Sequence, residues 1–203
     1  SRQRPRSGPG ARGRAMDCLA PLEVDAGGLG ARGREAGAFQ ADPPAKLRDY
    51  LYLGGQRAAL DREGLRGLGI THVLNVAHEL DCYHPECFEY LHCEIEDGGQ
   101  DDAILPCFQE ATEFVRRARG DAGKVLVHCF MGVNRSATVA MAVLMNLEGW
   151  TLHKAYEHTK LSRDCVAPFP GNRQKIAAWE LQTRGRCTLE EWLPPDAWPP
   201  RAG

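Results

Sequence analysis

Hydrophobic and polar positions follow two different periods between residues 47 and 184. Short apolar runs are typical of strands in a sheet, and apolar residues spaced three or four positions apart are typical of helices. Strands are predicted at residues 50–53, 72–76, 91–95 and 124–127, and helices at residues 61–68, 104–118, 135–147, 152–161 and 172–183. Because strands and helices alternate along the chain, we expect an α/β fold with a central, mostly parallel sheet flanked by helices. Residues 79–89 mix Asp, Pro and His without a period, which predicts an exposed loop.

The pattern divides the chain into three parts. Residues 1–45 are rich in Gly, Ala, Arg and Pro without a period and are predicted to be disordered. An organelle-targeting peptide is the alternative for this basic start, but its Pro and Gly residues oppose an amphipathic helix. Residues 46–186 are expected to form one folded domain, and residues 187–203 a loose tail rich in Pro and Trp. Trp192 and Trp198 are candidates for docking a partner within that tail.

Charge and composition narrow the classes of partner. The net charge is −2, but residues 1–15 hold five arginines and no acid, so 20 basic against 27 acidic residues remain, a balance of −7. An acidic body argues against nucleic-acid binding, which depends on neutralising backbone phosphates. The longest apolar run, residues 139–145, is far shorter than the roughly 20 residues that cross a bilayer, so no membrane partner is expected. The eight cysteines without a secretory signal indicate a cytoplasmic or nuclear protein.

One segment carries the candidate chemistry. From His128 to Ser136 the chain reads His-Cys-Phe-Met-Gly-Val-Asn-Arg-Ser, between a predicted buried strand and a predicted helix. Residues 129–134 can wrap with their backbone N–H groups pointing inward, and the helix N-terminus adds partial positive charge. Gly132 allows torsions that a side chain disfavours. The loop is therefore predicted to hold a phosphoryl group and to favour a thiolate at Cys129.

The residue types of this segment indicate their roles. Cys129 is the predicted nucleophile that attacks phosphorus, and Arg135 can hold two phosphoryl oxygens with its planar fork. Ser136 is expected to donate a hydrogen bond to the sulfur atom, and His128 to order the loop from the strand side. The predicted substrate-binding loop between them comprises Phe130, Met131, Gly132, Val133 and Asn134.

The run Val-Leu-Val-His-Cys-x5-Arg-Ser at residues 125–136, followed by an apolar helix, resembles the atypical dual-specificity protein phosphatases, members of the cysteine-based protein tyrosine phosphatase superfamily. The resemblance extends over about residues 47–184 and includes Tyr-Leu-Gly at residues 52–54 and Gly-Ile-Thr-His-Val-Leu-Asn at residues 69–75. It implies hydrolysis of phosphotyrosine, phosphoserine and phosphothreonine through a cysteinyl-phosphate, without a metal or another cofactor. It also implies phosphoprotein substrates and signalling kinases as partners. Oligomeric state is not indicated.

The same resemblance implies two further site residues. Asp97, 32 residues before Cys129, takes the place of the family's general acid, with Asp101 and Asp102 as alternatives on the same loop. Arg163 resembles the family's rim arginine, which receives a second phosphate or an acidic flank. A cation at the C-terminal end of a helix is the alternative for Arg163.

Two departures from the family pattern bear on the substrate. The family usually has Pro-Asn-x-Gly-Phe after the rim arginine, where this chain has Pro-Phe-Pro-Gly-Asn at residues 168–172, so altered support of the catalytic loop is expected. Asn134 replaces a common Ser, as in RNA 5′-triphosphatases, although those continue with Thr-Gly and this chain continues with Ser-Ala. Phosphatases of RNA 5′-phosphates or phosphoinositides, or a phosphoprotein-binding scaffold, therefore remain the alternatives. The loop has no lysine of the kind found in lipid-directed relatives, and it retains Cys129, which a scaffold would lack.

A second group of thiols and imidazoles lies upstream. Its members are Cys82, His84, Cys87, His92 and Cys93. Their spacing matches no common zinc finger, so no metal site is predicted, but one thiol can trap oxidised Cys129 in a disulfide. Tyr83 and Phe88 of the same region are candidates for contact with a phosphotyrosine ring.

Overall fold

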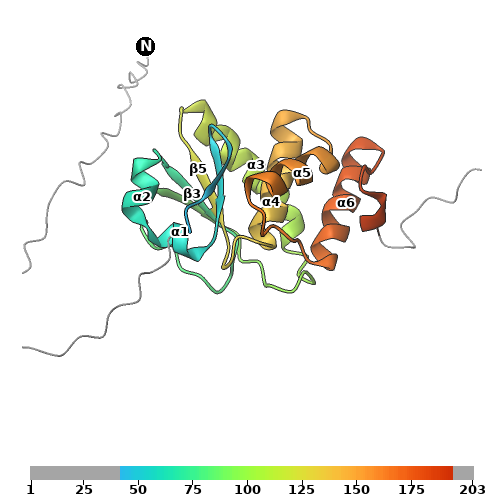
Figure 1. Ribbon diagram of the computed structural model, residues 1–203, viewed down its shortest axis with the longest axis horizontal. Coiled ribbons are helices and arrows are strands. Elements are labelled where there is room, and N and C mark those ends of the chain that lie inside the picture. Colours follow the sequence, from blue (N-terminus) through green and yellow to red (C-terminus); the bar gives the residue numbers. More distant parts are fainter. Residues whose placement is uncertain (1–41, 194–203) are drawn as a thin grey trace, which may run out of the picture. The chain divides into compact units, whose positions relative to one another are not determined.

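A computed structural model describes residues 42–193 of the 203-residue chain; residues 1–41 and Trp198 of the sequence predictions lie outside this range. One five-stranded sheet runs through the described part, in the spatial order β1-β2-β5-β3-β4 (Figure 1). Its strands are β1 (Ala45–Arg48), β2 (Leu51–Gly54), β3 (His72–Asn75), β4 (Glu89–His92) and β5 (Val125–His128). Strands β2, β5, β3 and β4 pair in parallel, and β1 pairs antiparallel with β2 at the edge. The predicted mostly parallel sheet is confirmed.

Alternation of side chains along the strands separates two hydrophobic cores. Leu51, Leu53 and Val127 belong to the larger core, while Tyr52 and Leu126 belong to the smaller one. This follows from strand geometry, in which successive side chains point to opposite faces. Both faces of the sheet are therefore covered.

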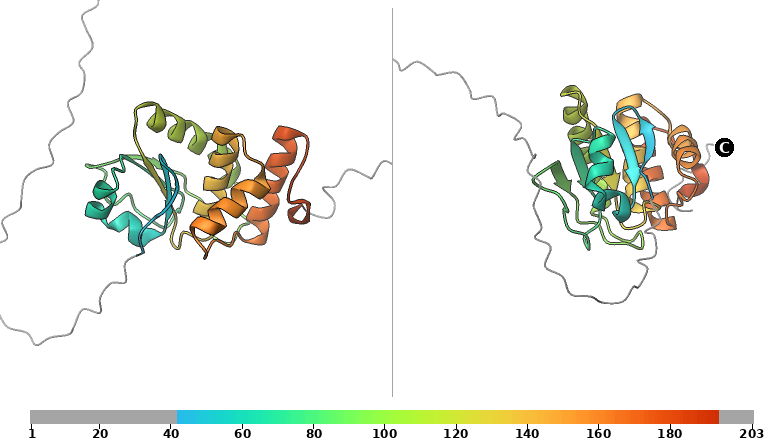
Figure 2. Two further views of the ribbon diagram at one scale, coloured as in Figure 1. Left: turned by 45° about the horizontal axis from the view of Figure 1, so that its top comes forward. Right: turned by 60° about the vertical axis from the view of Figure 1, so that its left-hand side comes forward.

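The helices divide between these two faces. They are α1 (Gln56–Leu60), α2 (Arg62–Gly67), α3 (Ile104–Gly120), α4 (Arg135–Glu148), α5 (Leu152–Ser162) and α6 (Pro170–Arg184), followed by the 3₁₀ helix η1 (Glu190–Trp192). Helices α1 and α2 contribute Ala59 and Leu65 to the smaller core. Helices α3, α5 and α6 surround α4 on the other face (Figures 1 and 2). No helix within residues 42–193 is long and apolar enough to span a membrane.

Helix α4 is the central helix of the larger layer. Residues 135–145 of α4 are buried without a break, and most are Ala, Val, Leu or Met. A helix that is apolar on all sides is typical of a protein core. It ends at Gly149, whose φ of 68° is the left-handed conformation that closes many helices. Its fixed position sets where its N-terminus meets the loop after β5.

Strand boundaries differ from the sequence prediction at one important place. The strand predicted at residues 91–95 is instead β4 at residues 89–92, so Glu89, which was assigned to the predicted loop, lies in this strand. Pairing with β3 fixes this register, because His72 lies opposite Glu89 and Asn75 opposite His92. After β4 the chain leaves the sheet, so residues 93–97 approach the loop after β5. Strand β1 and helix α1 were not predicted.

Both predicted domain boundaries need correction. Strand β1 begins at Ala45, inside the segment predicted to be disordered. At the other end, Cys187, Leu189, Trp192 and Leu193 are buried, although residues 187–203 were predicted to be loose. The Trp192 and Tyr156 rings pack edge to face at 4.9 Å. An aromatic side chain that finds an apolar surface extends the domain to at least residue 193.

Candidate active site

Strand β5 delivers Cys129 to the carboxyl edge of the sheet. His128, the last residue of β5, lies opposite Gly54 of β2 and Asn75 of β3. Cys129 follows directly and is 2% exposed. In open α/β sheets, ligands bind outside the carboxyl ends of parallel strands, so this edge is the expected place for a site.

The loop after β5 folds around the sulfur atom. The Gly132 N–H donates to Cys129 Sγ at 3.3 Å, and Ser136 Oγ lies 3.1 Å from the same sulfur. Gly132 has a φ of 71°, and a Cβ there would lie 2.6 Å from the backbone carbonyl of Gly54. Glycine is therefore required both for its torsion and for the close approach to β2. The predicted contact between Ser136 and the sulfur has the geometry of a hydrogen bond.

The guanidinium of Arg135 is bound by the carboxylate of Glu79, which lies in the loop after β3. Its Nη1 and Nη2 atoms each donate to one oxygen of Glu79 at 2.6 Å, and Nη1 also donates to the carbonyl oxygen of Ile95 at 2.9 Å. Burial disfavours the charge, but the Glu79 hydrogen bonds and the nearby Cys129 and Asp97 charges raise the pKa of Arg135 above its usual value. Arg135 Nε has no hydrogen-bond acceptor within residues 42–193. This atom is available for a phosphoryl oxygen.

Glu79 was not among the site residues predicted from the sequence. It was assigned to an exposed loop, whereas the structure places its carboxylate against Arg135, and the hydrogen bonds from Arg135 lower the pKa of Glu79. The loop after β3 reaches the site because β3 and β5 are neighbours in the sheet. The sequence signal that could have indicated Glu79 is an acidic residue a few positions after β3, the strand that pairs with β5. The pairing of the strands had to be known before that signal could be used.

Asp97 lies beside the guanidinium of Arg135. Its Oδ1 atom is 3.4 Å from Arg135 Nε and accepts a hydrogen bond from Asn134 Nδ2 at 2.9 Å. The alternative acids have other partners. Asp101 accepts backbone N–H groups with both oxygens, which lowers its pKa, and Asp102 pairs with Lys175. Of the three candidates, the geometry favours Asp97 as the general acid.

The departure at residues 168–172 does not leave the loop without an asparagine. Asn172 donates through Nδ2 to Asn134 Oδ1 at 2.9 Å, and the Phe169 N–H donates to the same oxygen at 2.7 Å. Asn172 therefore supports the catalytic loop from helix α6. The altered support that the sequence predicted consists of an asparagine that lies later in the same stretch, at position 172.

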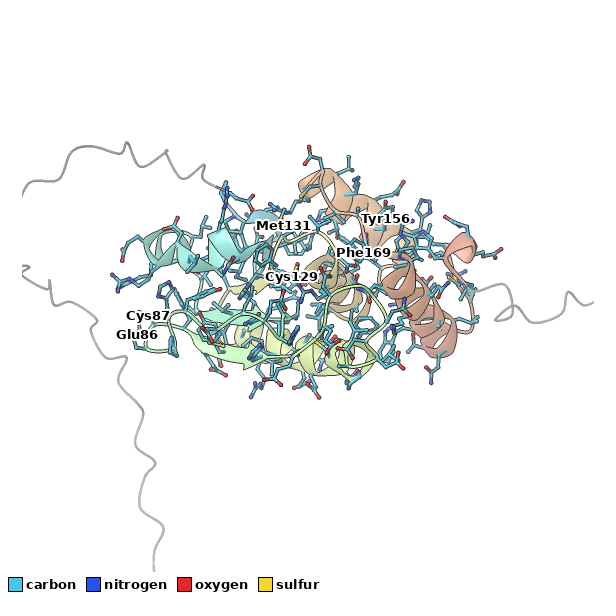
Figure 3. All side chains as sticks on the ribbon, turned by 90° about the horizontal axis from the view of Figure 1, so that it is seen from below. Glu86, Cys87, Cys129, Met131, Tyr156 and Phe169 are labelled. Atoms are coloured by element: carbon cyan, nitrogen blue, oxygen red, sulfur yellow. The ribbon has the colours of Figure 1, made fainter. Side chains whose placement is uncertain are left out.

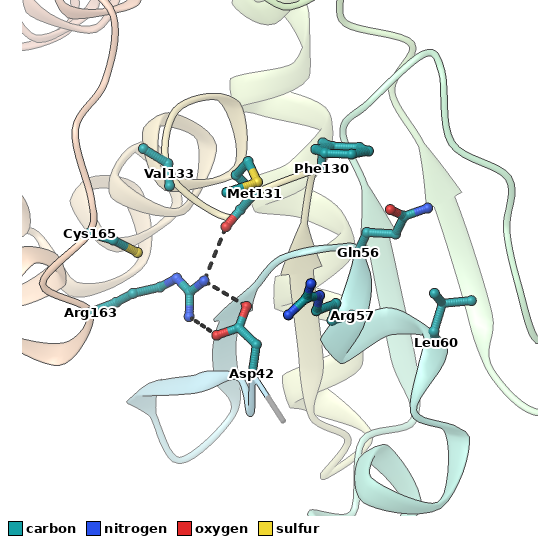
Figure 4. Close-up of a pocket in the computed structure, with 9 residues that line it drawn as sticks. All are labelled: Asp42, Gln56, Arg57, Leu60, Phe130, Met131, Val133, Arg163 and Cys165. Carbon is teal, nitrogen blue, oxygen red and sulfur yellow. Dashed lines mark hydrogen bonds and ion pairs between the residues drawn. The ribbon is translucent and has the colours of Figure 1, made fainter. Parts of the chain in front are cut away.

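Apolar side chains form the rim on one side of the loop. Phe130 and Met131 are 49% and 61% exposed and line a pocket of about 460 Å³ (Figure 4). The other lining residues are Asp42, Gln56, Arg57, Leu60, Val133, Arg163 and Cys165. Figure 3 shows Met131, Phe169 and Cys129 in the same region of the domain, which is seen there from below.

Arg163 does not present an open guanidinium at this rim. Its Nη1 and Nη2 atoms donate to the two oxygens of Asp42 at 2.9 Å, while Nε and Nη2 donate to the carbonyl oxygens of Gly132 and Met131 (Figure 4). Arg163 thus joins the segment before β1 to the catalytic loop. A second phosphate or an acidic flank must displace Asp42 to reach it.

His128 is a buried neutral side chain. It is fully buried, and desolvation lowers its pKa to about 4, with a smaller contribution from His92. Its carbonyl oxygen accepts a hydrogen bond from the Val76 N–H at 3.0 Å. The backbone of His128 therefore fixes the end of β5 against the chain after β3, while its ring fills space without charge.

The buried state of His128 predicts a pH dependence of stability. The unfolded pKa is about 6.5 and the folded pKa is about 4, so the unfolded chain binds more protons between these values. The free energy of unfolding should fall by about 3 kcal/mol as the pH drops from 6.5 to 4. Urea titrations across this range measure the loss, and His128→Gln should flatten the curve above pH 4.5. An unchanged slope in that variant would contradict this origin.

The upstream thiols and imidazoles have structural contacts of their own. The rings of His84 and His92 contact the carbonyl oxygens of Leu60 and Ala77 at 3.1 and 2.9 Å. Within residues 42–193, no three His, Cys, Asp or Glu side chains are arranged to hold a metal ion. Cys87 lies well away from Cys129 (Figure 3), which makes it unsuited to a disulfide with the nucleophile.

The two aromatic candidates upstream also differ from each other. Phe88 is 5% exposed in the smaller core, so it is not available to stack on a substrate ring. Tyr83 is partly buried, and its hydroxyl accepts a hydrogen bond from Gln56 Nε2 at 2.7 Å. Tyr83 thereby contacts a residue that lines the pocket beside the loop.

A thiol and a guanidinium on one loop, between a buried strand and a helix N-terminus, define the cysteine-based protein tyrosine phosphatase superfamily. A family model described as "Dual specificity phosphatase, catalytic domain" matches residues 51–182. Human protein phosphatase Slingshot homolog 1 is 37% identical over 141 residues, which cover 70% of this chain. The chain belongs to the dual-specificity phosphatase family.

Solved structures agree with this assignment. Human DUSP28 is 27% identical with a TM-score of 0.66, covering 70% of this chain and 95% of that one. A mouse putative dual specificity phosphatase complexed with zinc tungstate is 26% identical with a TM-score of 0.68, covering 83% of this chain and 99% of that one. The chain corresponds to only 12% of Drosophila melanogaster Slingshot and 13% of the human homolog. The likeness to Slingshot therefore concerns one part of those proteins.

Proposed function

We propose that this protein hydrolyses phosphotyrosine and phosphoserine or phosphothreonine in protein substrates through a cysteinyl-phosphate intermediate. The observation that carries the proposal is the convergence of Cys129, Arg135 and Asp97 at one edge of the sheet, with Arg135 Nε 3.4 Å from Asp97. Covalent catalysis needs a nucleophile, an electrostatic clamp and a proton donor, and these three side chains supply them.

The first chemical step transfers the phosphoryl group to sulfur. The Cys129 thiolate forms a bond to phosphorus while the bond from phosphorus to the substrate oxygen breaks. Arg135 and the loop N–H groups bind the phosphoryl oxygens, and Asp97 gives its proton to the leaving oxygen. The dephosphorylated side chain departs and leaves a phosphocysteine.

The second step restores the enzyme. Asp97, now a carboxylate, takes a proton from water as that water attacks phosphorus and the phosphorus–sulfur bond breaks. Ser136 Oγ lies 3.1 Å from the sulfur and donates a hydrogen bond to the thiolate that leaves. Inorganic phosphate is the second product.

A tetrahedral oxyanion suits this loop. Tungstate has the shape and charge of a phosphate, and the related mouse protein was crystallised in complex with zinc tungstate. In this chain the N-terminus of the 14-residue helix α4 and the buried Arg135 supply the complementary positive charge. The tungstate complex of this related protein supports the proposal that this chain binds a tetrahedral oxyanion such as a phosphoryl group.

A substrate panel tests the proposed class. Initial rates with phosphotyrosine, phosphothreonine and phosphoserine peptides, short-chain phosphoinositides and RNA with a 5′-triphosphate should favour the peptides. The loop has no lysine, and the body of the chain is acidic. Higher kcat/KM for the lipid or the RNA would assign another substrate to the same chemistry, and binding of phosphopeptides without phosphate release would favour a scaffold.

Cellular context follows from the nucleophile. A cysteine must be reduced to attack phosphorus, so we propose that the protein acts in the cytoplasm or nucleus, where thiols stay reduced. Signalling kinases that phosphorylate the same substrates are the proposed functional partners.

The role of Asp97 predicts a specific loss. Asp97→Asn should lower kcat/KM for phenyl phosphate by about 10²-fold, because an unprotonated phenolate is a poor leaving group. The loss should be much smaller for p-nitrophenyl phosphate, whose leaving group is stable without a proton. Asp102→Asn is the matched control, since Asp102 is 82% exposed and pairs with Lys175. Equal losses with both esters would remove Asp97 from the role of general acid.

A further inference from the structure

We propose that Asn134 is a positioning residue that holds Asp97 in place for proton transfer by linking it to helix α6. This inference rests on the proposed function, because it assigns a task to Asn134 only if Asp97 is the general acid. Asn134 is 4% exposed and is the residue before helix α4. Its side chain does not bond to the α4 backbone as a capping side chain would.

The orientation of the Asn134 amide is determined by its partners. Oδ1 of Asn134 accepts from the Phe169 N–H at 2.7 Å and from Asn172 Nδ2 at 2.9 Å. A backbone N–H is always a donor, so the oxygen must face Phe169 and the NH₂ group must face the other way. The NH₂ group then donates to Asp97 Oδ1 at 2.9 Å. The Asn134 amide therefore bridges α6 and Asp97: its oxygen accepts hydrogen bonds from Phe169 and Asn172 at the start of α6, and its NH₂ group donates to Asp97.

The α6 end of this bridge is rigid. Asn172 is 1% exposed in the first turn of α6. Gly99 and Gly171 approach so closely that a Cβ on Gly171 would lie 2.1 Å from the Gly99 carbonyl oxygen. Lys175 also donates to this oxygen at 2.8 Å. The loop that carries Asp97 is thus docked on α6 at several points.

Asp97 itself depends on this docking. Its side chain is 54% exposed, and it precedes Gly98 and Gly99, whose φ angles are 103° and 82°. Such a sequence does not fix a side chain by local packing. When a phosphoryl group takes Arg135 Nε as a donor, the ion pair between Arg135 and Asp97 weakens. The hydrogen bond from Asn134 Nδ2 to Asp97 Oδ1 then keeps the carboxyl group oriented.

The bridge also selects which oxygen carries the proton. Asn134 donates to Oδ1, so Oδ1 is an acceptor and the acidic proton of Asp97 belongs on Oδ2. A proton on Oδ2 is free to pass to the leaving oxygen. A serine at position 134 would carry a shorter side chain and would lack the amide group that contacts both Asp97 and α6.

The isosteric variant Asn134→Asp separates the two ends of the bridge. It keeps an oxygen for Phe169 and Asn172 but replaces the donor toward Asp97 by an acceptor. We expect kcat/KM for phenyl phosphate to fall about tenfold or more relative to p-nitrophenyl phosphate, because misplacing a catalytic group by about 1 Å can cost about 10²-fold. Asn134→Ser, which removes the bridge without adding charge, should shift the ratio in the same direction.

A double-mutant cycle distinguishes positioning from support of the loop. In the Asp97→Asn background, Asn134→Ser should leave the ratio of the two esters unchanged, because the residue through which it acts is already disabled. Equal losses for both esters, or an undiminished effect in that background, would overturn the proposal. If Asp97→Asn alone left the ratio unchanged, the assignment of Asp97 itself would fail, and the role of Asn134 with it. Binding of orthovanadate to each folded variant verifies that the phosphoryl site is intact.

Discussion

Replacing Cys129 with serine is expected to reduce kcat/KM for phosphotyrosine peptides by at least about 10⁴-fold. A serine hydroxyl lacks the ionised sulfur that attacks phosphorus, and residues that act as one catalytic unit show very large single losses. Gly132 N–H and Ser136 Oγ both face the sulfur at 3.3 and 3.1 Å, so the loop is arranged around this one atom. Initial-rate measurements on purified variants, together with acid-quenched trapping of a phosphoenzyme, check the result.

The control for this variant removes a thiol elsewhere near the same face. Cys165 is exposed and lines the pocket beside the loop, so Cys165→Ser tests loss of a nearby thiol without loss of the nucleophile. It should retain activity within about a factor of three. The Cys129→Ser protein should still bind phosphopeptide, because Arg135 and the loop amides remain. Rapid phosphate release by the serine variant would refute a cysteinyl-phosphate mechanism.

Replacing Arg135 with lysine is expected to reduce kcat/KM by roughly 10³-fold although the charge is preserved. Lysine is a point charge without a planar fork, so it cannot bind the carboxylate of Glu79 and a phosphoryl group at once. Loss of a preorganised donor to a transition-state oxyanion typically costs about 10²- to 10³-fold, and Arg135 supplies more than one donor. Steady-state kinetics with p-nitrophenyl phosphate, in which the leaving group needs little help, isolate this contribution.

Stability is the second measurement for this variant. Lysine keeps the charge but cannot reproduce the hydrogen bonds from the guanidinium to both oxygens of Glu79 and to the Ile95 carbonyl, and position 135 is 1% exposed. The free energy of unfolding should therefore fall by about 1–3 kcal/mol, measured by urea denaturation. Arg62→Lys is the matched control, because Arg62 pairs with Glu63 on the exposed surface of α2 and should change neither quantity. Near-normal activity of the Arg135→Lys protein would contradict the role of the guanidinium fork.

The agreement between sequence and structure is closest where structure is locally encoded. The apolar period of α3 and the continuous apolar stretch of α4 located both helices almost to the residue. The same holds for the segment from His128 to Ser136, because its Gly, Cys and Arg occupy fixed positions between a strand and a helix. These residues are neighbours in the chain, so their relative placement requires no knowledge of distant contacts.

Predictions were weaker wherever the reason for a residue's position lies in a distant segment. The β4 boundary was wrong because pairing with β3, not composition, sets where that strand ends. Residues 187–193 were predicted to be loose because the segment is short and partly polar. In the structure the Trp192 ring packs against the ring of Tyr156, which lies 36 positions earlier in the chain. Local propensity does not encode such contacts.

The sequence by itself determined the α/β class and indicated the candidate nucleophile and the candidate phosphate-binding loop, since each depends on residue types at fixed short spacings. Three contacts are visible only in the tertiary structure. Glu79 binds the guanidinium of Arg135, and Asp42 pairs with Arg163. Asn134 connects Asp97 to α6 through hydrogen bonds. The physical reason is that hydrogen bonds and ion pairs act over about 3 Å in space. Residues separated by 35 to 121 positions reach that distance only after the sheet and its helices have assembled.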